Sequence, residues 1–231
     1  MSENFVEIKD GPKDGAPENN ERAELTKLLV GKLQELHDLT DAAPLARARL
    51  QLDVAELLVS LERKPEAWTL AREAFTAALA QDAWKDAVEA CDVLYQCEQD
   101  GSTAALGMGV WLAVSFPVDP ELTLAMLMHI VEETPDHSDG AALAAVAARY
   151  VIDLRADDAQ HENLGLFANH LIAQVAARHS NMRDQTALDK WMDRLELRNP
   201  QVFLPRLGQV VDVIVGDAWW FDRDELRKKF D

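Results

Sequence analysis

Hydrophobic residues recur every three or four positions along most of the chain, starting at about Asn20. Because an α-helix turns once in about 3.6 residues, side chains with this spacing lie on one face of a helix. The pattern therefore predicts a series of amphipathic helices. The stripes are Leu25, Leu28, Leu29, Leu33 and Leu36; Leu45, Ala48, Leu52, Ala55 and Val59; Trp68, Ala71, Phe75 and Ala78; Trp84, Val88, Cys91 and Tyr95; Leu164, Phe167, Leu171 and Val175; and Leu188, Trp191, Met192 and Leu195.

One segment differs from the others because it has no charge on any side. Residues 104–116 read "AALGMGVWLAVSF", so a helix here would be apolar all round and must lie in the middle of the fold. Gly107 and Gly109 lower helix propensity but permit close approach of a neighbouring backbone. Two nearly apolar segments, 122–131 and 141–154, complete the expected core. The uncharged segment is too short to cross a bilayer, which needs about 20 apolar residues.

The segment 201–215 contains Pro205, and it continues into "QVVDVIVG", whose β-branched residues favour strands. A single strand in an otherwise helical chain would lack a partner for its backbone hydrogen bonds, so we interpret the segment as a helix. The chain is therefore predicted to be all-α, with about ten antiparallel helices in a helical-hairpin stack or a compact bundle. This helical domain spans residues 21–216.

Two terminal segments flank the helical domain. Residues 1–20 carry acids, Gly, Pro and Asn without a long apolar run, which indicates a flexible N-terminal tail and no signal peptide. Within this tail, Phe5, Val6 and Ile8 either form a short docking segment or are incidental apolar residues. Residues 217–231 form an aromatic and charged C-terminal segment.

The charge of the chain restricts its partners. It has 41 acidic and 23 basic residues, and a formal net charge of -18. Nucleic acids and anionic membranes are bound largely through Lys and Arg, so we expect no nucleic-acid and no membrane partner. Cys91 and Cys97 point to different faces of one predicted helix and are expected to stay reduced, which suits a cytoplasmic protein.

The stretch 50–81 has small residues at places where two helices would pack closely, namely Ala55, Ala67 and Ala74. In this respect it resembles a single tetratricopeptide repeat. It departs from that repeat at Ala71, where an aromatic residue is usual, and at Glu89, where a second copy would need a small residue. The resemblance implies a stack of helical hairpins.

A short polar stretch, "ETPDH" at residues 133–137, separates two of the predicted core helices. It resembles the E-x-P-D-H signature of the TorD, DmsD and NarJ chaperones, which are all-α acidic proteins that bind signal peptides or apoproteins of molybdenum enzymes. Phe167 and the pair His170 and Leu171 are similar to residues on a later helix of that family. Here Ser138-Asp139-Gly140 intervenes where the family has an apolar and acidic helix start.

These five residues, the ETPDH loop, have two possible roles. As a simple connection, Pro135 would stop the preceding helix at Glu133, and Asp136 or Ser138 would cap the next one. As a recognition site, the resemblance implies that Glu133, Asp136 and His137 act on a bound peptide through hydrogen bonding and charge, without catalysis.

The C-terminal segment sets Trp219, Trp220 and Phe221 side by side, followed by a short helix capped by Asp222. Three adjacent aromatic residues cannot all face inward from one helix, so at least one must be covered by another element or by a partner. The segment either packs back on the chain or anchors a partner protein.

The sequence contains no Glu-x-x-His pair, no phosphate-binding glycine motif and no nucleophile elbow. We therefore predict no catalytic, cofactor-binding or metal site, and a non-catalytic protein-binding adaptor or assembly chaperone that acts through helical surfaces and the C-terminal aromatic residues. The alternative is a structural or regulatory accessory subunit of a larger enzyme complex. A helical enzyme would instead gather His137, His161 or His170 with acids in a cleft.

Overall fold

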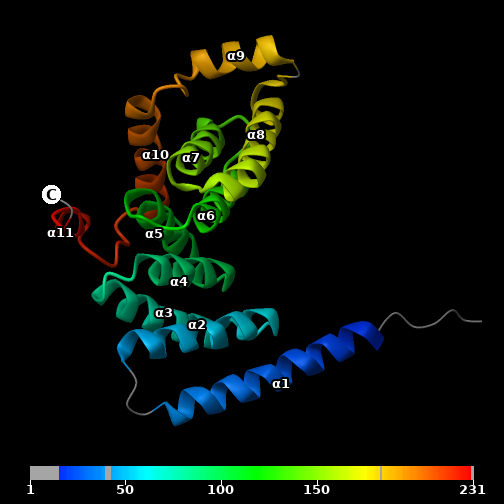
Figure 1. The fold of residues 1–231 in the computed structure, drawn as a ribbon, viewed down its shortest axis with the longest axis vertical. Coiled ribbons are helices and arrows are strands. Elements are labelled where there is room, and N and C mark those ends of the chain that lie inside the picture. Colours follow the sequence, from blue (N-terminus) through cyan, green and yellow to red (C-terminus); the bar gives the residue numbers. More distant parts are fainter. Residues whose placement is uncertain (1–15, 40–42, 183, 230–231) are drawn as a thin grey trace, which may run out of the picture.

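The computed structural model describes residues 16–39, 43–182 and 184–229, and side chains from Asn20 onward. The described residues form helices and no strand, so the all-α prediction is confirmed (Figure 1). The helices are α1 (Ala16–Asp38), α2 (Pro44–Ser60), α3 (Lys64–Ala80), α4 (Trp84–Gln96), α5 (Ser102–Ser115), α6 (Pro120–Glu133), α7 (Asp139–Arg155), α8 (Asp158–Ser180), α9 (Gln185–Arg194), α10 (Pro200–Val215) and α11 (Arg223–Arg227).

Helices α1 to α4 form a layered stack in the first half of the chain (Figure 1). Ala55, Ala67 and Ala74 have no exposed surface, and they let α2, α3 and α4 approach closely. Helix α1 begins at Ala16, earlier than the expected boundary at residue 20. The rest of the expected tail, with Phe5, Val6 and Ile8, lies outside the described residues.

Helix α1 packs on α2 by a narrow stripe, and among its described side chains Leu29 and Leu36 are buried. Leu28, Val30 and Leu33 are exposed by 51%, 62% and 39%. On this outermost helix, part of the apolar stripe expected from the sequence is therefore exposed to solvent.

Helix α5 lies at the centre of the molecule, as its uncharged sequence predicts. Every residue from Ala104 to Ala113 is buried, and the helix packs against α4, α6 and α10. A Cβ atom at Gly107 would lie 2.5 Å from a methyl carbon of Val215, and one at Gly109 would lie 2.6 Å from Cys91 Cβ. The prediction that these glycines permit close approach is confirmed.

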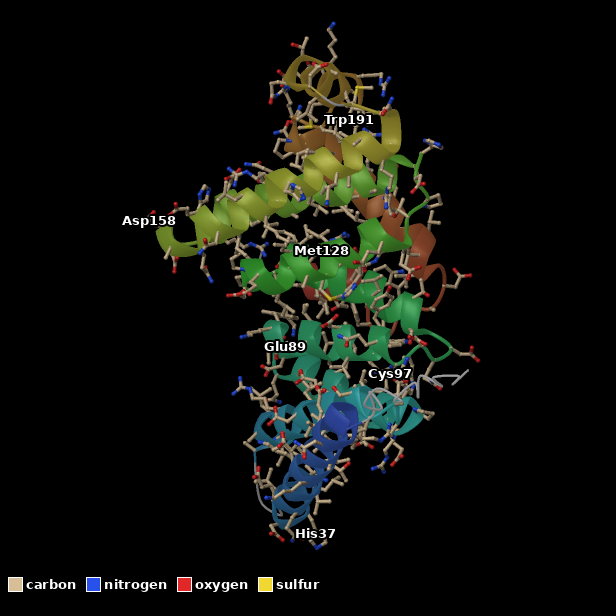
Figure 2. All side chains as sticks on the ribbon, turned by 90° about the vertical axis from the view of Figure 1, so that its right-hand side faces the viewer. His37, Glu89, Cys97, Met128, Asp158 and Trp191 are labelled. Carbon is tan, nitrogen blue, oxygen red and sulfur yellow. The ribbon has the colours of Figure 1, made fainter. Side chains whose placement is uncertain are left out.

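The second half of the chain wraps α6, α8 and α10 around the alanine-rich helix α7 (Figure 1). Helix α10 returns from the far end of the molecule to pack on both α5 and α7. It is helical through Pro205, as predicted. Figure 2 places His37 of α1 at one end of the elongated molecule and Trp191 of α9 near the other. None of the helices in the described ranges has the length and apolar character that a bilayer crossing needs.

Candidate functional site

The ETPDH loop lies between α6 and α7, and Ser138, the residue directly after it, begins α7. Helix α6 stops at Glu133, and the Thr134 hydroxyl donates to the carbonyl of Ile130 at 2.5 Å. Ser138 is the N-cap of α7, where its Oγ accepts from the Gly140 amide at 3.3 Å. Of the two caps expected from the sequence, Ser138 is the one used.

The loop is fixed against the end of α8. His137 Nδ1 lies 3.1 Å from the carbonyl oxygen of His179, and Asp136 Oδ1 lies 3.4 Å from Arg178 Nε. The Arg178 guanidinium also donates to the Val131 carbonyl at 2.9 Å. Asp136 and His137 are both exposed. These two side chains therefore hold the loop in place from its outer side.

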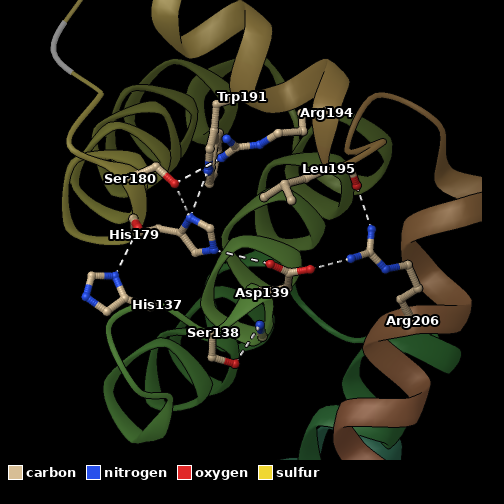
Figure 3. Close-up of polar contacts among 10 residues, drawn as sticks. His137, Ser138, Asp139, His179, Ser180, Trp191, Arg194, Leu195 and Arg206 are labelled. Carbon is tan, nitrogen blue, oxygen red and sulfur yellow. Dashed lines mark hydrogen bonds and ion pairs between the residues drawn. The ribbon is translucent and has the colours of Figure 1, made fainter.

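A polar junction follows directly after the loop (Figure 3). Asp139 pairs through Oδ1 with His179 Nε2 at 3.2 Å and through Oδ2 with the Arg206 guanidinium at 2.8 Å. The Trp191 indole donates to His179 Nδ1 at 3.2 Å, so the ring proton of His179 must be on Nε2. The junction ties α7, α8, α9 and α10 together.

This junction contains the residue types of a hydrolytic triad, since Ser180 Oγ lies 2.5 Å from His179 Nδ1. A general base must have a free nitrogen to accept the serine proton. Here Nδ1 already accepts from Trp191, and Ser180 Oγ accepts from the Arg194 guanidinium at 3.0 Å. The arrangement is a structural network and does not form a nucleophile and base pair.

On the α4 side, the loop borders an acid-lined hollow of about 670 Å³. The Tyr95 hydroxyl donates to Glu133 Oε1 at 2.5 Å, which fixes the Glu133 carboxylate on the rim. Burial and this hydrogen bond raise the pKa of Tyr95, so its hydroxyl stays a donor. The hollow is lined by Val59, Glu62, Lys64, Tyr95, Gln96, Glu98, Gln99, Ser102, Thr103, His129, Glu132 and Glu133.

His129 lies in this acid-lined hollow with a carboxylate at each ring nitrogen. Its Nε2 is 3.0 Å from Asp92 Oδ1, and its Nδ1 is 3.3 Å from Glu132 Oε2. The hydrogen bond to Asp92 is the main cause of a raised His129 pKa, which burial of the ring opposes. An imidazole whose protonated form is favoured in this way is a poor general base.

The raised pKa of His129 predicts a pH-dependent contribution to stability. That contribution is fully present below about pH 6.5, the pKa of an unfolded histidine, and is lost as the pH rises through the higher folded value. We expect His129→Gln to lower the free energy of unfolding by roughly 0.5–1 kcal/mol at about pH 5.5 and by less at about pH 8.5, measured by urea denaturation. His37→Gln, at an exposed histidine of α1, is the control, and an equal pH dependence in both variants would contradict the expectation.

On the α7 and α10 side, the loop borders a second, more apolar hollow of about 500 Å³. Val213 stands on its edge and is 84% exposed. Thr103 and Glu133 line both hollows, so the acid-lined hollow and the apolar hollow adjoin at these residues. The apolar hollow is lined by Thr103, Glu133, Thr134, Pro135, Ser138, Asp139, Gly140, Leu143, Arg206, Gln209, Val210, Val213 and Ile214.

Of the loop residues proposed from the sequence, Glu133 lines the hollows, whereas Asp136 and His137 lie outside both. Sequence reasoning missed Tyr95 and His129, because nothing local links two residues on different helices. The exposure of Val213 could not be predicted either, because a run of β-branched residues on an amphipathic helix does not show which of them faces solvent.

The aromatic residues of the C-terminal segment pack on the chain itself. The Trp220 ring lies 5.4 Å from Phe75 and 6.1 Å from Trp68, and the Phe221 ring lies 5.5 Å from Trp111, between centroids. Trp219, Trp220 and Phe221 are all half-buried. Of the two placements left open by the sequence, packing on the chain is the one observed.

The remaining cysteine and histidine side chains of the described residues do not gather in one place. In the described ranges, no three His, Cys, Asp or Glu side chains are arranged to hold a metal ion. Burial raises the pKa of Cys97 to about 11, which disfavours a reactive thiolate. His161 pairs with Asp153 at 2.8 Å, His170 is exposed on α8, and none of His137, His161 and His170 lines either hollow.

Comparison with protein-family models, curated proteins and solved structures finds no match to this chain. The likeness to tetratricopeptide repeats and to the TorD-type chaperones therefore rests on the sequence motifs and stays a prediction.

Proposed function

We propose that the protein is a non-catalytic adaptor or assembly chaperone that binds an extended segment of a client protein across the two adjoining hollows. One observation carries the proposal: Glu133 and Thr103 line both hollows, which brings an acid-lined surface next to an apolar one. Such a surface suits recognition of a peptide by side-chain type at successive positions.

The chemistry of the two hollows defines the client segment. Glu62, Glu98, Glu132 and Glu133 line the first hollow with two basic side chains, Lys64 and His129, so acids outnumber bases there. Basic side chains therefore fit there, and the net charge of -18 attracts them from a distance. In the second hollow, Leu143, Val210, Val213 and Ile214 offer apolar contacts. The client segment is expected to carry basic residues next to apolar ones.

The ETPDH loop supports this role by position. Thr134, Pro135 and Ser138 form part of the apolar hollow, while the outer side of the loop is fixed to α8 through Asp136 and His137. A fixed loop loses little conformational freedom on binding. The resemblance to chaperones that bind signal peptides or apoproteins agrees with this proposal.

The proposal is tested by fluorescence anisotropy with a labelled peptide of about 14 residues that alternates arginine and leucine. We expect Val213→Asp to weaken binding about tenfold or more, because it places a charge at the apolar edge. Val30→Asp, at an exposed valine of α1, is the matched control and should bind normally. Equal binding by all three proteins, or equal binding of a glutamate and leucine peptide, would refute the proposal.

The loop is tested separately by replacing Asp136 and His137 together with alanine. Because both side chains are exposed, the melting temperature should stay nearly unchanged. The peptide should bind severalfold more weakly, since the loop loses the contacts that fix it to α8. Unaltered binding would show that the contacts of the loop with α8 do not contribute to the proposed site.

A second candidate, an accessory subunit held permanently in a larger complex, is favoured by α1. The outermost helix of a stack usually carries a polar outer face. Here Leu28, Val30 and Leu33 are exposed instead. An adaptor should purify alone as a stable, monodisperse protein, whereas an obligate subunit should aggregate without its partner.

A further inference from the structure

The C-terminal residues 217–229, which we name the strap, cross from α10 to the first half of the molecule (Figure 1). They cover a groove, the α3–α5 groove, formed by Trp68, Arg72 and Phe75 of α3 and Trp111 of α5. This groove is separate from the two hollows beside the ETPDH loop. An inference about it is therefore independent of the proposed function.

The strap shows which chemistry the groove accepts. Trp220 meets Phe75 edge-on at an interplanar angle of 75°, and the Arg72 guanidinium lies 3.9 Å from the centre of a Trp220 ring. Burial lowers the pKa of Arg72, whose guanidinium is partly removed from water between these rings. An aromatic side chain between an arginine and other aromatic rings is a strong and specific contact.

The strap has fewer buried residues than the helices that it covers. Its backbone hydrogen bonds run within the strap or to Val215 of α10. Leu226 is its one buried residue among those described. Its other anchors are the half-buried rings of Trp219, Trp220 and Phe221, together with partly exposed ion pairs such as Arg223 with Asp212. Exposed ion pairs contribute little and are screened by salt. A segment with few buried contacts opens more readily than the core.

The strap also leaves space beside it. A hollow of about 400 Å³ lies between α5 and α10, lined in part by Trp111, Arg223 and Arg227. A second, shallower hollow of about 640 Å³ lies on α3 beside Trp68 and Arg72. A longer segment could therefore contact more surface here than the strap does.

We infer that the α3–α5 groove is a docking site for an aromatic segment of a partner protein, and that the strap occupies it in cis. The partner segment has the chemistry of the strap, with two or three adjacent aromatic residues followed by an acid. It displaces the strap because it also covers the hollow on α3, which compensates for the millimolar effective concentration of a tethered competitor. The strap sets the affinity that a partner must exceed.

The experiment uses the full-length chain and a fluorescein-labelled peptide with the strap sequence DAWWFDRDELRKK as the probe. Trp220→Ala in the protein vacates the place on Arg72 and Phe75, so we expect the probe to bind at least tenfold more tightly than to the unaltered chain. Adding Arg72→Ala should abolish that gain. A probe in which both tryptophans are alanine should not bind. Phe167→Ala, at an exposed aromatic residue of α8, is the control and should behave as the unaltered chain.

Circular dichroism and thermal melting establish that each variant is folded. If Trp220→Ala does not fold, Arg223→Ala takes its place, because it breaks the ion pair with Asp212 and the stacking on Trp219 but leaves the aromatic residues of the groove. Hydrogen exchange of the unaltered chain should also be faster in the strap than in α5. Equal probe binding by the folded variant and the unaltered chain would overturn the inference. So would a concentration-dependent dimer dissolved by the probe, which would assign the groove to a second copy.

Discussion

Gly109→Val is expected to lower the free energy of unfolding by about 3 kcal/mol, which corresponds to a fall in melting temperature of about 6–12 °C. A Cβ at Gly109 would lie 2.6 Å from Cys91 Cβ and 2.5 Å from the Met126 methyl group. The methionine can move, but Cys91 Cβ is fixed to the backbone of α4. Helix α5 must therefore move away from α4, and the core loses its close packing. Reversible urea unfolding measures the change.

The matched control is Gly31→Val on α1, where a Cβ would meet nothing within 4 Å. There, the better helix propensity of valine should leave stability unchanged or slightly higher. A double-mutant cycle tests the cause: Cys91→Gly should be less destabilising in a Gly109→Ala background than in the unaltered chain. Additive effects would show that the clash with Cys91 is not the source of the loss.

The central position of α5 is the part of the fold that the sequence predicts best. A helix with no charged side chain must be surrounded by other helices, and residues 104–113 are buried accordingly. The helix at 200–215 was also predicted, against its β-branched composition, because an unpaired strand would leave backbone groups unsatisfied. Both predictions rest on requirements that hold wherever the neighbouring helices lie.

Contacts between distant parts of the chain are what the sequence could not supply. The return of α10 onto α5 and α7 depends on shape matching, such as that of Val215 against Gly107, which no local pattern reveals. The five leucines of α1 follow helical spacing, yet Leu28 and Leu33 remain exposed because α2 covers only part of that face. Periodicity identifies an apolar face but not what covers it.

In the candidate site, too, the sequence identifies residue types but not their tertiary contacts. The motif at residues 133–137 lies in the loop that borders both hollows, and Glu133 stands on their shared rim. Asp136 and His137 were proposed for the same role, but they contact α8, because the loop is folded with its outer side toward Arg178 and His179. A short motif fixes residue types, and tertiary packing decides which way each side chain points.

Arg155→Ala should be the second strongly destabilising substitution. Arg155 lies at the end of α7, and its guanidinium donates to the carbonyls of Ala113 and Val114 at 2.7 and 2.8 Å and to Val118 at 3.3 Å. These carbonyls belong to the last turn of α5 and the chain just after it, where a helix lacks internal partners. In the variant, these half-buried carbonyls lose a charged hydrogen-bond donor. The free energy of unfolding should therefore fall by about 2–3 kcal/mol.

Arg155→Lys should recover only part of this loss, because one ammonium group cannot reach three carbonyls in the geometry of the guanidinium fork. The control is Arg198→Ala, which breaks exposed ion pairs with Asp189 and Asp193 and should change stability only slightly. Salt separates the two causes. The Arg155 acceptors are neutral carbonyls, so its effect should persist in about 0.5 M NaCl, while the small Arg198 effect should shrink. A loss at Arg155 that disappears in salt would mean that its charge, and not its hydrogen bonds to α5, stabilises the fold.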